Sequence, residues 1–156
     1  MPLFKKVIYS TDFSPLAGYA LQFVKKLKNA GMESVIVVHV VNELSVTLPN
    51  GLDLRENKTT VEALESADRE YLYSVFERAE AIKEKIEELG VDVVLKVITG
   101  SNTAETIVDM AEAERIDVIV IGAHGKGFLK ELILGSVSLD VVRKAKCPVL
   151  LIKKTD

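Results

Sequence analysis

Glycine and hydroxyl residues are concentrated in one short stretch, residues 122–138 (GAHGKGFLKELILGSVS), with the composition of an anion-binding loop. The stretch directly follows a wholly apolar run at 118–121 (VIVI), which is typical of a buried strand. Glycine allows a ligand to approach the backbone, and a helix that begins at Gly135-Ser136 offers N–H groups to an anion. The pattern fits a phosphate-binding loop, and it also fits a plain strand-to-helix turn.

Two familiar phosphate-binding motifs do not occur in this stretch. It contains neither the Walker A pattern G-x-x-x-x-G-K-[ST] nor the dinucleotide pattern G-x-G-x-x-G. Ser136 and Ser138 are candidate hydroxyl donors, and Lys126 and Lys130 are candidate cations. Lys126 is the better phosphate candidate because it lies among the glycines, although both lysines also fit ordinary solvated positions.

The elements that must position these residues alternate in type along the chain. Strands are predicted at 6–9, 35–41, 91–99, 118–121 and 149–152, where apolar or β-branched residues form short runs. Helices are predicted between them, from Ser14-Pro15, over about 61–89, from the cap Asn102, and from near Ser136 to Cys147-Pro148. This alternation predicts one α/β domain over residues 1–156 with a mostly parallel sheet.

Residues 42–60 interrupt the alternation and are predicted to form a long surface loop. In open α/β sheets a ligand binds beyond the carboxyl ends of the strands. Four such ends can be compared, and three of them are rich in small or hydroxyl residues. The four ends are 10–14 (STDFS), 42–43 with this loop, 100–102 (GSN), and the glycine stretch. Asp12 is a candidate ligand-binding residue at the first of these ends, and it also fits a cap for the following helix.

Composition excludes several classes of function. The formal net charge of −3 gives no electrostatic reason to expect nucleic acid as a partner. No run approaches 18 apolar residues, so no membrane-spanning helix is expected. Two histidines and one cysteine argue against a transition-metal site, and His39 within an apolar strand is expected to be packed or hydrogen-bonded. The single Cys147 favours a cytoplasmic location.

The spacing Gly122-x2-Gly125-x9-Gly135-Ser136 resembles the ATP-binding signature of the universal stress protein family. Further motifs that resemble the family follow the same order along the whole chain: KKVIYSTDFSPLAGYAL at the start, VHVV at 38–41, Thr99-Gly100, and Cys147-Pro148 before the last strand. The resemblance implies a five-stranded parallel sheet in the order 3-2-1-4-5 with helices on both faces. In that order Asp12 and Gly122 emerge at the switch point of the sheet.

The resemblance also implies a cofactor and its binding residues. The cofactor is ATP, with or without Mg²⁺; Asp12 and the backbone near Ser10 and Val40 hold the adenine or ribose edge. Gly100 lines the ribose side, and the glycine stretch wraps the ribose and phosphates. The complete set of implied nucleotide-binding residues is Ser10, Thr11, Asp12, Val40, Gly100, Gly122, Ala123, His124, Gly125, Lys126, Gly127, Gly135, Ser136, Val137 and Ser138. Some ATP-binding members have proline in place of Ser10.

Three functions remain open at this level. The first is a nucleotide-dependent regulatory protein of the stress response that presents a changed surface to an unknown protein partner. The second is a slow ATP hydrolase, and the third is a dimeric scaffold that does not turn over nucleotide. No catalytic residue is assigned, because phosphoryl transfer needs a positioned base and charge stabilisers that the sequence does not reveal. The resemblance and the apolar run at 149–152 also predict a homodimer through an exposed sheet edge.

Overall fold

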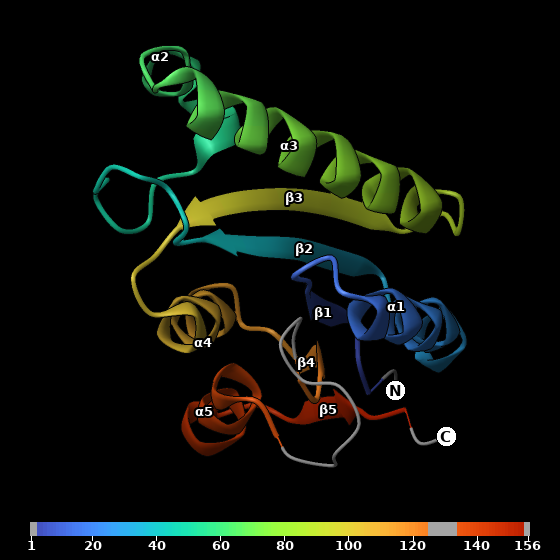
Figure 1. The fold of residues 1–156 in the computed structure, drawn as a ribbon. Helices are drawn as coiled ribbons and strands as arrows, with labels where there is room; N and C mark the ends of the chain where they lie inside the picture. The colour runs from blue at the N-terminus through green and yellow to red at the C-terminus, as the bar shows by residue number, and fades with distance from the viewer. Residues whose placement is uncertain (1–2, 125–133, 155–156) are drawn as a thin grey trace.

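The computed structural model describes residues 3–124 and 134–154 and contains a five-stranded sheet (Figure 1). The strands are β1 (Lys6–Ser10), β2 (Ser34–Val41), β3 (Asp92–Thr99), β4 (Val118–Gly122) and β5 (Val149–Ile152). All four pairings are parallel, and the strand order is β3-β2-β1-β4-β5. The predicted fold class and the predicted order 3-2-1-4-5 are therefore confirmed.

Helices cover both faces of the sheet, as predicted. The helices are α1 (Pro15–Leu27), α2 (Lys58–Glu62), α3 (Ser66–Glu87), α4 (Thr103–Ala113) and α5 (Ser136–Lys144), with short 3₁₀ turns η1 (Lys28–Ala30) and η2 (Leu54–Glu56). The buried residues of α1 and α3 share one apolar cluster, and those of α4 and α5 share the other (Figure 1).

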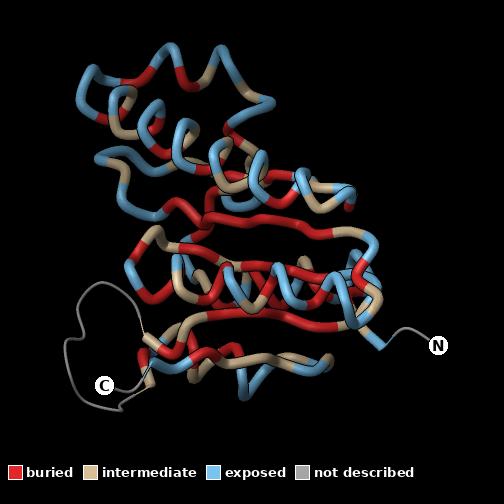
Figure 2. The backbone as a smooth tube through the Cα atoms, turned by 90° about the vertical axis from the view of Figure 1, so that its right-hand side faces the viewer, coloured by how far each residue is buried: buried red, intermediate tan, exposed pale blue. Residues whose placement is uncertain are grey.

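The sheet divides these two clusters along its central strand. In β1, Val7 and Tyr9 face the cluster beneath α1 and α3, whereas Ile8 faces the cluster beneath α4 and α5. All three are at most 1% exposed, and the central strands are almost continuously buried along their length (Figure 2). Burial on both faces explains why the strands appear in the sequence as unbroken apolar runs rather than as alternating patterns.

The segment 42–60 is more ordered than the predicted surface loop. Asp53 caps η2 by accepting a hydrogen bond from the Arg55 N–H at 3.2 Å, and α2 begins at Lys58. The predicted loop was wrong in this second half because Leu54, at 1% exposure, anchors the segment in the core. The first half is held at Ser45, whose backbone N–H donates to the buried Asp68 carboxylate at 3.2 Å.

The helix predicted over 61–89 is divided into two. Glu65 is extended, with φ −59° and ψ 153°, and it separates α2 from α3. The break allows Val61 and Leu64 both to enter the core beneath α3. Apolar periodicity alone did not reveal this break, because both residues also fit the spacing of one continuous helix.

The turn from β3 into α4 is packed around Gly100. A β-carbon at this glycine would lie 2.3 Å from the Thr106 hydroxyl oxygen and 3.2 Å from a Val40 methyl group. The Thr106 hydroxyl is itself fixed, because it donates to the Asn102 carbonyl at 2.9 Å. Gly100 is therefore required for close packing at the start of α4.

We expect Gly100→Ala to lower the free energy of unfolding by about 1–3 kcal/mol, because the added methyl group overpacks the turn. Thr106→Ala removes the oxygen that the new methyl group meets. The double variant should consequently be more stable than the sum of the two single changes predicts, as measured by chemical denaturation. Strictly additive effects would contradict the contact.

Candidate functional site

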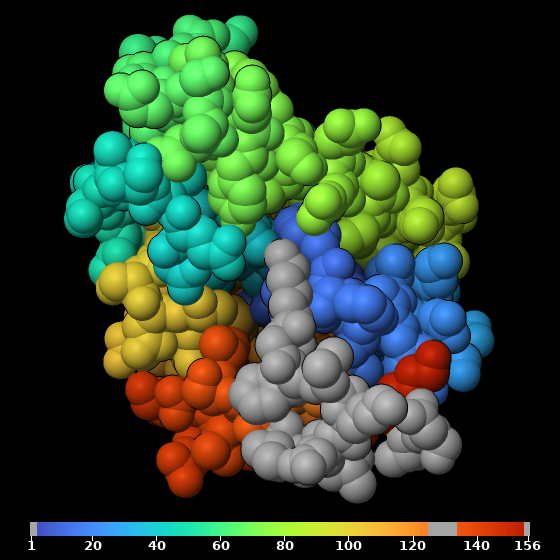
Figure 3. All heavy atoms as spheres, viewed as in Figure 1, coloured from blue at the N-terminus to red at the C-terminus, as the bar shows by residue number. Residues whose placement is uncertain are grey.

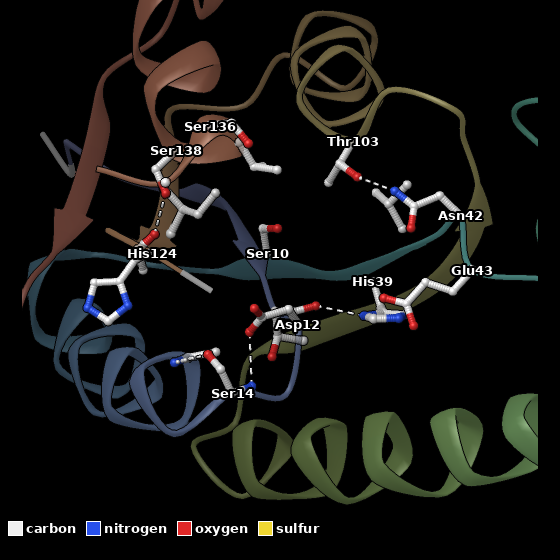
Figure 4. Close-up of a pocket in the computed structure, with 17 residues that line it drawn as sticks. Ser10, Asp12, Ser14, His39, Asn42, Glu43, Thr103, His124, Ser136 and Ser138 are labelled. Carbon is white, nitrogen blue, oxygen red and sulfur yellow. Dashed lines mark hydrogen bonds between the residues drawn. The ribbon is translucent and has the colours of Figure 1, made fainter. Parts of the chain in front are cut away.

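A cavity of about 310 Å³ opens at the carboxyl ends of the strands. It lies where β1 and β4 are neighbours and the strand order reverses, which is the usual ligand position in an open α/β sheet. The elements around this region include α1 (blue), α4 (yellow) and α5 (orange-red) in the space-filling view (Figure 3). The close-up shows side chains from several of these elements pointing into the cavity (Figure 4).

Most of the described residues predicted for the site line this cavity. They are Ser10, Thr11, Asp12, Val40, Gly122, His124, Gly135, Ser136, Val137 and Ser138. The predicted Gly125, Lys126 and Gly127 lie outside the described residues. Gly100 lines a separate hollow of about 200 Å³. Ala123 is buried, and its N–H donates to the Ile152 carbonyl at 2.8 Å, so neither Gly100 nor Ala123 lines the cavity.

Seven lining residues were missed: Ser14, Ala17, His39, Asn42, Glu43, Thr103 and Ile121. Asn42 and Glu43 directly follow β2, and Thr103 begins α4. The expectation that a ligand binds beyond the carboxyl ends of the strands placed these segments near the cavity. The sequence offered no means of choosing individual side chains within them. The Asn42 amide donates to the Thr103 hydroxyl at 3.1 Å and thereby joins two of these segments.

Side-chain hydrogen bonds shape the turn between β1 and α1. The Ser14 N–H donates to Asp12 Oδ1 at 2.9 Å, and the Ser14 hydroxyl oxygen accepts from the Ala17 N–H at 3.2 Å. Asp12 therefore supports the start of α1, as the capping alternative expected, while it also lines the cavity. A carboxylate can do both, because its oxygens offer several acceptor positions.

Phe13 follows Asp12 with an unusual backbone conformation. Its φ is +62°, a left-handed conformation that costs a non-glycine residue about 1–3 kcal/mol. Its ring lies 4.7 Å from the His39 ring, measured between centroids, and the Arg78 guanidinium lies 5.9 Å from the Phe13 centroid. These contacts of the Phe13 ring hold the strained turn in place directly beside the cavity.

His39 connects β2 with the same turn. It is 7% exposed, and its Nδ1 lies 2.8 Å from the Thr11 carbonyl oxygen. A carbonyl can only accept, so Nδ1 carries the proton in this bond. The prediction that His39 is packed or hydrogen-bonded is confirmed, and the structure shows both.

The opposite wall is formed by the amino end of α5. The Gly135 N–H donates to the Ala123 carbonyl at 2.8 Å, so the chain returns to the end of β4 after the glycine stretch. The first bond within α5 runs from the Leu139 N–H to the Gly135 carbonyl at 2.9 Å. The N–H groups of residues 136–138 consequently have no partner within the helix, and the helix dipole favours an anion beside them.

Ser138 has a structural role in this wall. Its hydroxyl donates to the Gly122 carbonyl at 2.7 Å, and the residue is 3% exposed. The proton of this hydroxyl is therefore used within the protein, so the prediction that it donates to a phosphate does not fit this geometry. Ser136 keeps its position at the amino end of α5 on the cavity wall.

The described lining residues include the acidic Asp12 and Glu43 but no lysine or arginine. The α5 amino end is thus the electropositive side of the described cavity, and the two carboxylates lie toward β1 and β2. The described residues contain no group of three or more His, Cys, Asp or Glu side chains suited to a metal ion. Within the same residues, no helix is long and apolar enough to cross a membrane.

The fold and the position of the cavity define an open α/β domain with a candidate ligand site at its switch point. The chain belongs to the universal stress protein family, whose model matches residues 3–153. Universal stress protein MJ0577 from Methanocaldococcus jannaschii is 35% identical over 157 residues, which cover 97% of this chain and 96% of that protein.

Solved structures agree with this assignment. A structure of MJ0577 aligns with a TM-score of 0.74 at 37% identity and covers 99% of both chains. A universal stress protein from Archaeoglobus fulgidus, solved in complex with dAMP, aligns with a TM-score of 0.62 at 25% identity. That alignment covers 98% of this chain and the whole of the other.

Tyr9, directly before Ser10, allows a test of burial beside the site. Burial raises the pKa of Tyr9 to about 12, and its hydroxyl donates to the Ala17 carbonyl of α1. Between pH 10 and 12 the unfolded chain releases this proton while the folded protein keeps it. Stability should therefore fall with rising pH, by up to about 2–3 kcal/mol from this group.

Tyr9→Phe should remove that part of the pH dependence, as measured by urea unfolding at pH 9 to 11.5. Tyr73→Phe, at a position that is 50% exposed, is the control for loss of a tyrosine hydroxyl. If stability depended on pH equally steeply in Tyr9→Phe and in the parent, the raised pKa of Tyr9 would be contradicted.

Proposed function

We propose that this protein binds ATP in the cavity at the switch point and acts as a cytoplasmic, nucleotide-dependent switch for a protein partner in the stress response. The observation that carries the proposal is the amino end of α5, held by Gly135 across the cavity from Asp12. This end supplies backbone N–H groups for phosphate, and the opposite side supplies side chains for the nucleoside.

In the proposed binding mode, the phosphates lie against the N–H groups of residues 136–138. The adenine and ribose lie toward Asp12 and the backbone at Val40, at the ends of β1 and β2. The Archaeoglobus fulgidus relative in complex with dAMP supports an adenine nucleotide as the ligand class. Lys126, outside the described residues, is the nearest lysine in sequence to the cavity wall.

Charge favours binding of the nucleotide together with Mg²⁺. A triphosphate brings several negative charges into a cavity that already contains the Asp12 and Glu43 carboxylates. Mg²⁺ commonly binds through substrate phosphates with only one or two protein carboxylates. The described residues therefore suit a metal held mainly by the nucleotide.

The site supports binding better than hydrolysis. Phosphoryl transfer needs a positioned base and a cation at the transferred phosphate. No described lining residue is an arginine, and Arg78 lies over the Phe13 ring instead. His124 lines the cavity on the β4 side, and we assign it no catalytic role.

Nucleotide retained during purification provides the first test. Protein denatured directly after purification should release adenine nucleotide at near one molecule per chain, as measured by chromatography. Refolded or nucleotide-free protein should bind ATP in calorimetry, and added Mg²⁺ should tighten that binding. Absence of ATP binding by folded protein would refute the proposal, whereas steady phosphate release without a partner would favour the hydrolase.

Gly135→Val tests the role of the α5 amino end. Gly135 has φ −64° and ψ 158°, which valine can adopt, so the new side chain adds bulk without forcing a left-handed backbone. We expect ATP affinity to fall at least about tenfold, equivalent to about 1.4 kcal/mol. Gly18→Ala is the control, because a β-carbon there meets nothing within 4 Å. Undiminished affinity in folded Gly135→Val would contradict the binding mode.

We further propose a homodimer through β5, the terminal strand of the described sheet. The carbonyls of Pro148 and Ile152 accept bonds from Ile119 and Ala123 on the β4 side. Because alternate strand residues direct their backbone groups to opposite sides, Leu151 directs its N–H to the outer edge.

Leu151→Pro should therefore remove a bond of the dimer while it preserves the pairing of β5 with β4. We expect the mass from light scattering to change from that of a dimer toward that of a monomer. Circular dichroism should show that the fold is retained. A monomeric mass for the parent protein at micromolar concentration would refute the dimer.

A further inference from the structure

The helical layer formed by α4 and α5 does not extend fully over β3. Ile36, Val38 and Val40 of β2 lie on this face and are at most 8% exposed. On β3 the residues that face the same way are Asp92, Val94, Lys96 and Ile98, and none of them is buried. Val94 is 50% exposed, which is unusual for a valine in the middle of a strand.

A groove of about 430 Å³ follows this incompletely covered strip, between β3 and the flank of α4. Ile98, Met110 and Ala113 provide apolar surface along it, and the side chain of Lys96 also lines it. Val94 continues the same face of β3 toward the amino end of the strand. The groove therefore offers apolar contact area to a further element packed beside α4.

Carboxylates outnumber cations along the groove. Glu105, Asp109 and Glu114 line it, against the single ammonium of Lys96. Glu105 is paired with Lys144 at 3.4 Å, an exposed pair outside the groove lining. Asp109 and Glu114 are both exposed and lie along the apolar strip. A complementary surface would therefore combine apolar residues with lysine or arginine.

The size of the groove suits a short helix. α4 has 11 residues and is about 16 Å long at 1.5 Å per residue. A helix that packs beside it at the usual separation of about 8–10 Å would extend the layer of α4 and α5 over β3. About three turns, with apolar residues at helical spacing and basic residues beside them, match the length and the charge of the groove.

We propose that the groove formed by β3 and α4 docks a basic amphipathic helix of a partner protein. This inference specifies the partner of the proposed switch and rests on that proposed function. The groove and the cavity share one turn: Asn102 lines the groove and Thr103 lines the cavity. A partner docked in the groove would thus contact the turn that borders the nucleotide.

A fluorescent, end-capped 14-residue peptide of leucine and lysine at amphipathic helical spacing is the probe. The test variant is Asp109→Lys/Glu114→Lys, which reverses two charges of the groove. The matched control is Glu84→Lys/Glu87→Lys, which makes the same change of net charge at exposed positions on α3, on the other face of the sheet. Fluorescence-anisotropy titrations of the 156-residue chain then compare the affinities of the parent, the groove variant and the control variant for the peptide.

We expect the groove variant to bind the peptide at least about tenfold more weakly than the parent, because each reversal turns an attraction into a repulsion. The control should bind within about twofold of the parent. In a further variant, Val94→Ser should weaken binding without any change of charge. Hydrogen exchange should show protection by the peptide over β3 and α4.

Equal affinity for all three proteins, or equal loss in both charge variants, would overturn the proposal, because binding would then depend only on overall charge. If the parent protein self-associates as its concentration rises and the groove variant does not, the groove binds a second copy of this chain. That result would also overturn the proposal. ATP binding is measured by calorimetry in the parent and in every variant. Retained ATP binding with unaltered peptide binding refutes the groove alone, whereas absence of ATP binding by the folded parent refutes the proposed function.

Discussion

Burial of β1 between two helical layers is the constraint on which the rest of the structure depends. Its central residues, Val7, Ile8 and Tyr9, are at most 1% exposed and contribute to both apolar clusters. A strand buried on both faces can end only where its backbone again meets polar partners or solvent. Because β1 and β4 are parallel neighbours, the turns that follow them lie side by side at the carboxyl ends of the strands, where the hydrogen-bonded segments surround the cavity.

The fold was largely predictable because each strand is short, apolar and separated from the next by a helix-forming segment. Ser14-Pro15 and Asn102 marked the starts of α1 and α4 correctly, since a cap depends on neighbouring residues alone. The interruption at Glu65 was not predictable, because Val61 and Leu64 both enter the core and their spacing also fits one continuous helix. Local apolar patterns therefore do not reveal the break.

The candidate site was predicted in its location but not in all of its residues. The ends of β1, β2 and β4 and the start of α5 supplied the ten predicted positions that line the cavity. Gly100 has a role in packing instead, which only the distance to Thr106 reveals. Likewise, Ser138 and His39 are positioned by bonds to the carbonyls of Gly122 and Thr11, and these partners are remote in sequence.

The contact between 51–53 and the end of β3 has a consequence for assembly. The Gly51 N–H donates to the Thr99 carbonyl at 2.8 Å, the Thr99 N–H donates to the Leu52 carbonyl at 3.0 Å, and Asp53 forms an antiparallel bridge with Ile98. The chain thus occupies part of one border of its own sheet. In the proposed dimer the copies join through the opposite border, so a ribbon that continued through the end of β3 would have to displace these bonds.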